Sequence, residues 1–210
     1  MGMNDKLQTV RWGIMGTARI ATRVSRAMQA VEGAEASVIA SRSETRAASW
    51  GAEHGIPGIA GSYQALLDDE TLDAIYIPLP PSMHHEWTIR AAEHGKHVLC
   101  EKPIAMNASQ AEEMAAACRE NQVQLMDSTM WVHSPRATDM KRVLQSGQLG
   151  ELSRVTSAFT IMLDLIEDEL RYDRKRGGGS LMDLGWYNIR ATLWAFGSLP
   201  EQVLGSGQYV

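Results

Sequence analysis

Short apolar runs alternate with segments of helical periodicity through the first part of the chain. In the helical segments, apolar residues recur every three or four positions, as in helices that pack one face on a core. The runs between them are apolar throughout rather than alternating, which is typical of parallel strands covered by helices on both faces. The predicted strands are 10–15, 36–40, 74–77, 97–100 and 122–126, and the predicted helices are 19–30, 44–54, 83–93 and 108–119, the last with Asn107 as its N-cap.

The pattern changes after about residue 128. Residues 136–148 and 183–196 have helical periodicity, whereas 152–163 and 202–210 have strand character. Two candidate strands are few for an independent domain. We therefore expect residues 1–128 to form one domain and residues 129–210 to form part of a second. The predicted fold class is α/β, a doubly wound parallel sheet followed by part of an open-sheet α/β domain.

Composition narrows the function. The chain has 210 residues, with 44% hydrophobic and 21% charged residues, which is ordinary for a soluble globular protein. Its net charge of −5 argues against nucleic acid as a partner, because phosphate binding needs a basic excess. There is no apolar run of about 20 residues, so we expect no membrane span. The two cysteines, Cys100 and Cys118, favour free thiols in a reducing cytoplasm, and no cluster of residues has the spacing of metal ligands.

A turn typical of phosphate binding lies between the first predicted strand and helix. Residues 16–21 read GTARIA, so small residues stand where a dinucleotide fingerprint has glycines. Gly16 suits the tight turn and Ala21 the close packing of helix on strand, while Ala18 adds one methyl group where glycine is usual. The free N–H groups of the following helix would face a pyrophosphate. A tight turn without a ligand is the alternative for this motif taken alone.

The end of the second strand indicates the type of dinucleotide. NAD-binding domains carry an acidic residue near this point for the ribose 2′-hydroxyl, and here the sequence has Ser41 and Arg42 instead. A serine hydroxyl and a guanidinium suit a 2′-phosphate, and Arg46 lies one helical turn further on. We therefore expect NADP, with NAD as the alternative cofactor. Arg42 as a solvated surface residue is the alternative for that side chain.

Several segments together resemble one enzyme family. Residues 95–103, GKHVLCEKP, resemble the GKHVLxEKP segment of the Gfo/Idh/MocA oxidoreductases. Residues 11–17 resemble the family's first strand and loop, 62–67 its small helix, 76–84 its proline-rich loop, and 177–187, GGGSLMDLGWY, its second-domain motif. The resemblance covers nearly the whole chain from residue 10 onward.

The resemblance implies a Rossmann domain followed by a larger open-faced α/β domain, with NAD or NADP as cofactor. It also implies a cis peptide bond before Pro103. The family's active-site lysine, aspartate and tyrosine fall on Lys102, Asp183 and Tyr187. The expected cofactor-binding residues are Met15, Gly16, Thr17, Ala18, Arg19, Ile20, Ser41, Arg42, Leu79, Pro80, His84, Glu101 and Lys102.

The residue types fit those roles. Lys102 follows a buried strand at the end where ligands bind in open α/β sheets. Asp183 and Tyr187 are four residues apart and so share one helix face, behind a glycine run that permits unusual backbone angles. We expect Tyr187 to exchange the alcohol proton, since a nearby lysine cation favours the phenolate. A helix-capping aspartate and a core tyrosine are the alternatives for this pair taken alone.

Competing functions follow from these observations. The first is an NADP-dependent oxidoreductase that moves a hydride between nicotinamide and a hydroxyl or carbonyl group of a sugar, polyol or dihydrodiol. The second is a nucleotide-binding protein without turnover, because the second domain is incomplete. A flavodoxin-like binding module with a fortuitous glycine loop is the third. Chains of the family extend further, and the resemblance implies that their completed second sheet often forms a homo-oligomer contact.

Overall fold

The computed structural model describes residues 9–162 and 169–207. The chain divides into two compact units. The first contains Met1–Ser128 together with Arg174–Gly177, and the second contains Thr129–Asp173 together with Gly178–Val210.

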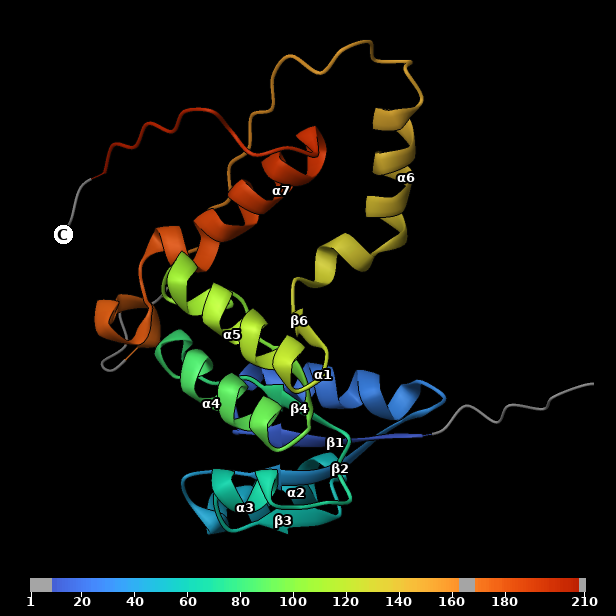
Figure 1. The fold of residues 1–210 in the computed structure, drawn as a ribbon, viewed down its shortest axis with the longest axis vertical. Coiled ribbons are helices and arrows are strands. Elements are labelled where there is room, and N and C mark those ends of the chain that lie inside the picture. The colour runs from blue at the N-terminus through green and yellow to red at the C-terminus, as the bar shows by residue number, and fades with distance from the viewer. Residues whose placement is uncertain (1–8, 163–168, 208–210) are drawn as a thin grey trace, which may run out of the picture. The chain divides into compact units, whose positions relative to one another are not determined.

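Six parallel strands form the centre of the first unit, in the order β3-β2-β1-β4-β5-β6 (Figure 1). Chain order therefore runs outward from β1 in one direction and from β4 in the other. Right-handed crossovers then place the helices between β1 and β3 on one face of the sheet and those between β4 and β6 on the other. This arrangement confirms the predicted α/β fold class. The strands are β1 (Val10–Met15), β2 (Ala34–Ala40), β3 (Gly58–Ala60), β4 (Ala74–Ile77), β5 (His97–Cys100) and β6 (Leu125–Asp127).

Helices cover both faces of this sheet, as the apolar strands predict. Adjacent residues of β1 belong to different core clusters: Ile14 packs with Ala21 of α1 and Ala47 of α2, whereas Met15 packs with Leu66 of α3 and Met114 of α5. Both faces of the sheet are therefore packed with apolar side chains, and the first unit has a hydrophobic core on each side of the sheet. The helices are α1 (Arg19–Ala30), α2 (Glu44–His54), α3 (Tyr63–Leu67), α4 (Pro81–Glu93) and α5 (Ala108–Glu120).

Local sequence signals explain most of these boundaries. The Asn107 side chain accepts a 3.0 Å hydrogen bond from the Gln110 N–H, which confirms the predicted cap of α5. Strand β6 begins at Leu125 rather than at residue 122, because Gln122 has a positive φ of 58° and belongs to the turn after α5. Strand β3 has three residues and was not expected from the sequence.

The second unit is helical in its described part. Its elements are η1 (Met130–His133), α6 (Pro135–Gln145), η2 (Leu170–Tyr172), the π-helical η4 (Leu181–Gly185) and α7 (Trp186–Phe196), while η3 (Arg174–Arg176) belongs to the first unit. The strands expected at 152–163 and 202–210 are absent from residues 152–162 and 202–207, and their remaining positions lie outside the described residues. A strand needs a partner for its backbone groups, and the described part of this unit offers none.

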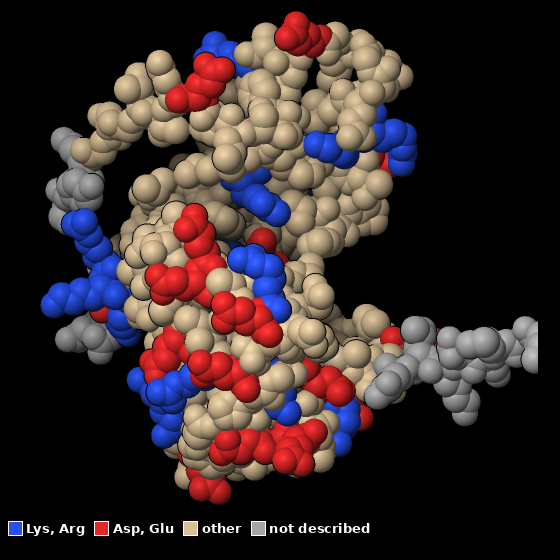
Figure 2. Space-filling view, in the orientation of Figure 1, with Lys and Arg blue, Asp and Glu red and all other residues tan. Residues whose placement is uncertain are grey.

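The surface of the first unit mixes both signs of charge. Figure 2 shows acidic side chains, with basic ones among them, over the helices α4 and α5. Two of the contacts there are the Arg90–Glu86 ion pair of 2.9 Å within α4 and the His85–Glu113 contact of 2.7 Å between the helices. None of the helices among residues 9–162 and 169–207 has the length and apolar character that crossing a bilayer requires.

Candidate active site

Segments that follow four parallel strands meet at one edge of the sheet. β1 leads into Gly16, β2 into Ser41 and Arg42, β4 into Leu79, and β5 into Glu101. A methyl group added to Gly16 would lie 3.1 Å from Leu79 Cδ2. The segment after β1 is therefore in contact with the segment after β4. Strand order reverses between β1 and β4, and the crevice outside this switch point is where open α/β sheets bind ligands.

The turn after β1 has the geometry of an anion-binding loop. Gly16 has a φ of +114°, a backbone conformation that residues with a β-carbon rarely adopt. Helix α1 then starts after Ala18, with no capping side chain and no acidic residue in its first turn. Its first N–H groups and the positive end of its dipole are therefore suited to a phosphate group. Thr17 and Ala18 are half-buried, so one methyl group fits in place of the usual glycine.

Flanking residues of this turn have different surroundings. The Met15 side chain is fully buried in the core, so a cofactor contact at this position is limited to the backbone. Arg19 is exposed at the first helical position, and Ile20 is half-buried. All of these residues were expected to bind the cofactor. The periodicity of the strand and of the helix nevertheless buries their side chains to different extents.

Basic and hydroxyl side chains gather at the end of β2, where a carboxylate would indicate NAD. Ser41 is 5% exposed, and its hydroxyl accepts a 3.5 Å hydrogen bond from the Ser43 N–H. Arg42, just before α2, and Arg46, in its first turn, are exposed. Both guanidinium groups act electrostatically on the phenol of Tyr63, which starts α3. The two guanidinium groups and the phenol therefore lie near one another at this edge of the sheet.

A buried carboxylate fixes the segment that carries the predicted catalytic lysine. The hydroxyl groups of Tyr76 and Ser128 donate hydrogen bonds of 2.7 and 2.8 Å to Glu101 Oε1, and the Lys102 N–H donates to Glu101 Oε2 at 3.2 Å. The bond between Lys102 and Pro103 is cis, as the resemblance implies. Glu101 is 7% exposed and occupied by these donors. Its carboxylate thus links Tyr76 and Ser128 to the backbone of Lys102, and its contact with a cofactor stays a prediction.

The His84 ring contacts two backbone segments in the interior of the first unit. Sequence reasoning placed this residue with the cofactor-binding set, but its side chain is fully buried. Its ring nitrogens lie 2.8 Å from the Leu79 carbonyl oxygen and 3.0 Å from the Pro103 carbonyl oxygen. His84 thus joins the segments after β4 and β5. Burial lowers the pKa of its imidazole, so the ring is neutral at pH 7 and donates to one carbonyl at a time.

The glycine motif at residues 177–179 is shaped by close backbone approach. A methyl group on Gly178 would lie 2.5 Å from the Leu170 carbonyl oxygen and 2.7 Å from that of Arg171, so a side chain does not fit. Gly177 and Gly179 have positive φ angles of 92° and 111°. Gly177 belongs to the first unit, where it lies against Pro81 at the start of α4. Gly178 therefore permits the close backbone approach, and Gly177 and Gly179 adopt the unusual backbone angles that the sequence suggested.

Asp183 and Tyr187 lie on either side of the junction between η4 and α7. Asp183 Oδ2 accepts a 2.9 Å hydrogen bond from Arg171 Nε, and the same guanidinium binds Glu169 Oε1 at 3.1 Å. The Tyr187 ring packs edge-on against Phe159, with centroids 5.3 Å apart. Both residues are half-buried in the second unit, whereas Lys102 lies in the first.

Sequence reasoning missed some of the residues that build these sites. Lys96, within the recognised 95–103 segment, is 6% exposed and donates 2.8 Å hydrogen bonds to the carbonyl oxygens of Asp69 and Leu72. Arg171 and Tyr63 were likewise given no role. The available signal for Lys96 was a basic residue directly before the apolar strand β5. No group of three His, Cys, Asp or Glu side chains among the described residues is arranged to hold a metal ion.

These features define a dinucleotide-binding Rossmann domain joined to a second unit. Residues 10–128 match the family model described as "Oxidoreductase family, NAD-binding Rossmann fold", and residues 137–210 match the model of the GFO/IDH/MocA C-terminal domain. The chain belongs to the Gfo/Idh/MocA family of oxidoreductases.

Individual relatives agree with this assignment. The chain is 42% identical over 193 residues to D-xylose 1-dehydrogenase (NADP(+)) 2 of Haloferax volcanii, covering 91% of this chain and 58% of that protein. It is 40% identical to a dTDP-3,4-didehydro-2,6-dideoxy-alpha-D-glucose 3-reductase of Actinomadura kijaniata, covering 87% of this chain and 54% of that protein. The chain thus spans less than two thirds of the length of these relatives.

A solved structure is similar as well. The crystal structure of a 3-ketoreductase from Actinomadura kijaniata, in complex with NADP and TDP-benzene, superposes with a TM-score of 0.83 at 37% sequence identity. The match covers 89% of this chain and 57% of that one.

Proposed function

We propose that the chain carries out the cofactor-binding part, and part of the substrate-binding part, of an NADP-dependent oxidoreductase. The reaction is hydride transfer between nicotinamide and a hydroxyl or carbonyl group of a sugar, polyol or dihydrodiol. In this proposal, residues 1–128 bind the dinucleotide and residues 129–210 belong to the substrate domain. A cytoplasmic location and a homo-oligomer contact through the second domain complete the proposal.

The observation that carries it is the sheet edge around Gly16. An uncapped helix start next to a glycine turn suits a pyrophosphate, and the end of β2 offers Ser41, Arg42 and Arg46 with no carboxylate among residues 41–43. The names of the Haloferax relative and of the solved reductase complex both include NADP. These points favour NADP over NAD.

The chain's own residues then have distinct tasks. When bound, the nicotinamide ring supplies the site that gives or accepts the hydride. Lys102, held by Glu101, presents its ammonium at the carboxyl edge of the sheet, where it stabilises negative charge on the reacting oxygen. Tyr187 exchanges the proton of that oxygen, and Asp183, which is paired with Arg171, orients the substrate hydroxyl or the lysine.

Sugar-like substrates are supported by the relatives. One is named for D-xylose and another for a dTDP-linked dideoxysugar, so both names denote sugars. The shared chemistry is oxidation or reduction at a carbon of the sugar that bears a hydroxyl or carbonyl group. We propose the same substrate class here.

A fluorescence titration of the full chain with NADPH and NADH tests the cofactor, and NADP reduction with a panel of aldoses, inositols and dihydrodiols tests the reaction. We expect tighter binding of NADPH and turnover with at least one sugar. Failure to bind either nucleotide would refute the proposal.

A nucleotide-binding protein without turnover is the second candidate. The observation that favours it is the second unit, in which no strand pairing exists among residues 129–162 and 169–207. Tight NADPH binding with no turnover on any member of the panel would select this candidate.

A further inference from the structure

The Tyr63 side chain points from the start of α3 toward the phosphate-binding turn. Its hydroxyl oxygen lies 3.7 Å from the position that a β-carbon on Gly16 would occupy. Helix α3 follows β3, so its first residue is at the carboxyl edge of the sheet, where the cofactor site lies. The ring itself packs edge-on against Trp87, with centroids 5.2 Å apart, while the Arg90 guanidinium lies over the Trp87 ring. The phenol is thus held with its hydroxyl directed to the turn.

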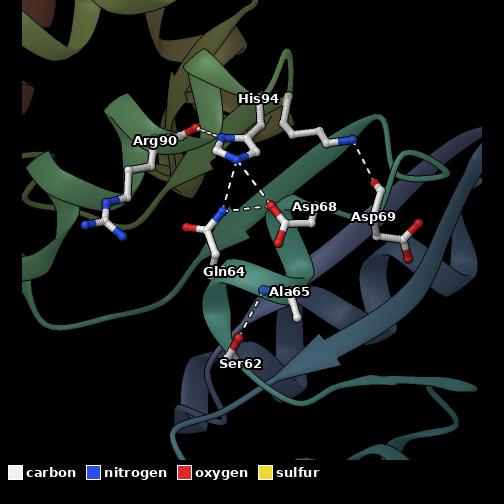
Figure 3. Close-up of polar contacts among 8 residues, drawn as sticks. Ser62, Gln64, Ala65, Asp68, Asp69, Arg90 and His94 are labelled. Atoms are coloured by element: carbon white, nitrogen blue, oxygen red, sulfur yellow. Dashed lines mark hydrogen bonds and ion pairs between the residues drawn. The ribbon is translucent and has the colours of Figure 1, made fainter.

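Polar contacts at both ends of α3 fix the helix that carries this tyrosine (Figure 3). The Ser62 hydroxyl caps the helix by accepting a 3.0 Å hydrogen bond from the Ala65 N–H. At the other end, Gln64 Nε2 lies 2.8 Å from Asp68 Oδ1 and 3.0 Å from His94 Nε2. A five-residue helix is short, but these contacts anchor it to the end of α4. Tyr63 is therefore preorganised before any ligand binds.

The chemistry around the hydroxyl suits an anion. Within the described residues, the Tyr63 hydroxyl has no hydrogen-bond partner in the protein, although the ring is half-buried. Arg42 and Arg46 act on it electrostatically and lower its pKa, but burial is the larger effect and the net pKa is raised. The phenol therefore keeps its proton at neutral pH and is a donor, placed beside two cations.

We propose that the Tyr63 hydroxyl donates a hydrogen bond to the 2′-phosphate of NADP and acts with Arg42 and Arg46 to select NADP over NAD. This inference rests on the proposed function, since it assigns a residue to the same cofactor site. It makes Tyr63 a specificity-determining residue. The loop after β3 then contributes to recognition together with the loop after β2.

The test compares the full chain with its Tyr63→Phe variant, which keeps the ring packing on Trp87 and removes the hydroxyl alone. Dissociation constants are measured by calorimetry for NADP, NAD, 2′,5′-ADP and 5′-AMP. We expect the variant to bind NADP and 2′,5′-ADP about tenfold more weakly, with roughly unchanged affinity for NAD and 5′-AMP. Tyr172→Phe, at an exposed tyrosine of the second unit, is the matched control and should leave all four constants unchanged.

The outcomes separate this inference from the proposed function. If the unmodified chain binds neither NADP nor NAD, the proposed function itself is wrong, and the inference falls with it. If the unmodified chain binds NADP and Tyr63→Phe binds it equally well, only the role of Tyr63 is overturned. Equal weakening of NADP and NAD would place the hydroxyl on another part of the cofactor and would also overturn the 2′-phosphate assignment. Thermal unfolding of the variant checks that the fold is retained.

Discussion

The hydroxyl of Tyr76 lies 2.7 Å from Glu101 Oε1, with both side chains in the interior of the first unit. Burial, followed by the nearby Glu101 carboxylate, raises the pKa of Tyr76 far above its usual value, so the phenol always donates this hydrogen bond. Because Glu101 in turn accepts from the Lys102 N–H, the pair links the middle of β4 to the predicted catalytic lysine. A hydrogen bond to a buried carboxylate is stronger than one between neutral groups.

Tyr76→Phe should therefore destabilise the protein by about 1.5–3 kcal/mol, the usual range for a hydrogen bond to a charged group. The ring volume is kept, so the loss reports the hydroxyl. Urea unfolding measures it, and Ser128→Ala, which removes the other hydroxyl donor to Glu101 Oε1, is the matched variant. A change below about 0.5 kcal/mol for Tyr76→Phe would show that water replaces the lost donor.

The lowered pKa of His84 leads to a prediction of how the free energy of unfolding depends on pH. Its pKa in the folded protein is lowered, chiefly by burial, whereas the unfolded chain should titrate near the ordinary value of about 6.5. Between these two values the unfolded state binds more protons, so the free energy of unfolding decreases as pH falls below about 7. The stabilisation is fully present above that pH.

Urea unfolding between about pH 7.5 and 5.5 checks this expectation. His84→Gln removes the titrating ring and should flatten the decrease in this window, while His85→Gln, a neighbour on the surface of α4, should retain it. An unchanged slope in His84→Gln would assign the pH dependence to other groups.

Lys96 provides a prediction for the opposite end of the sheet. Its ammonium donates to the carbonyl oxygens of Asp69 and Leu72, which lie in the turn before β4. Lys96→Met keeps the chain length but leaves both carbonyls without this donor, so we expect a loss of about 2 kcal/mol. Cofactor affinity should not change, because the carboxyl edge is distant from this turn along the strands. A stable variant with weakened NADP binding would contradict this separation.

The first unit was largely predictable because buried parallel strands leave continuous apolar runs. Strands such as Ala74–Ile77 and His97–Cys100 were expected with the bounds that the structure shows. β3 was missed because three residues between turns carry little pattern. In the second unit, β-prone composition at 152–162 did not produce a strand, since the described residues offer no partner strand.

Candidate site residues were predicted less completely than the strands. The positions of Ser41, Arg42 and Lys102 follow from strand ends, which sequence patterns locate well. The burial of His84 and the packing of Tyr63 depend on contacts between elements far apart in sequence. One-dimensional patterns do not contain such contacts, so the sequence alone did not separate direct ligands from positioning residues.

Close backbone packing at Gly178 predicts an intolerant position. An alanine methyl group would meet the carbonyl oxygens of Leu170 and Arg171, and backbone atoms do not move aside cheaply. Gly178→Ala should cost about 1–3 kcal/mol and loosen the glycine motif. Gly205→Ala, where a methyl group meets open space, is the control. Limited proteolysis near residue 178 would detect the change, and equal resistance of both variants would contradict it.

Tyr187 and Lys102 give the most direct test of the proposed chemistry. Tyr187→Phe keeps the packing on Phe159 but removes the hydroxyl that is proposed to exchange the proton, so turnover should fall by about 10²–10⁴ while NADPH affinity stays nearly constant. Lys102→Met should lower turnover similarly, because it removes the cation that is proposed to stabilise the reacting oxygen.

Steady-state rates and NADPH titrations on the same samples separate the two effects. The control is Tyr172→Phe, at an exposed tyrosine of the second unit, which should behave like the unmodified chain in both assays. Unaltered turnover in Tyr187→Phe would remove this residue from the mechanism. Weakened NADPH binding with unaltered maximal turnover would instead make it a binding residue. Loss of turnover alone, in both Tyr187→Phe and Lys102→Met, is what proton exchange beside a stabilising cation requires, because each substitution then affects the transition state and leaves the bound cofactor undisturbed.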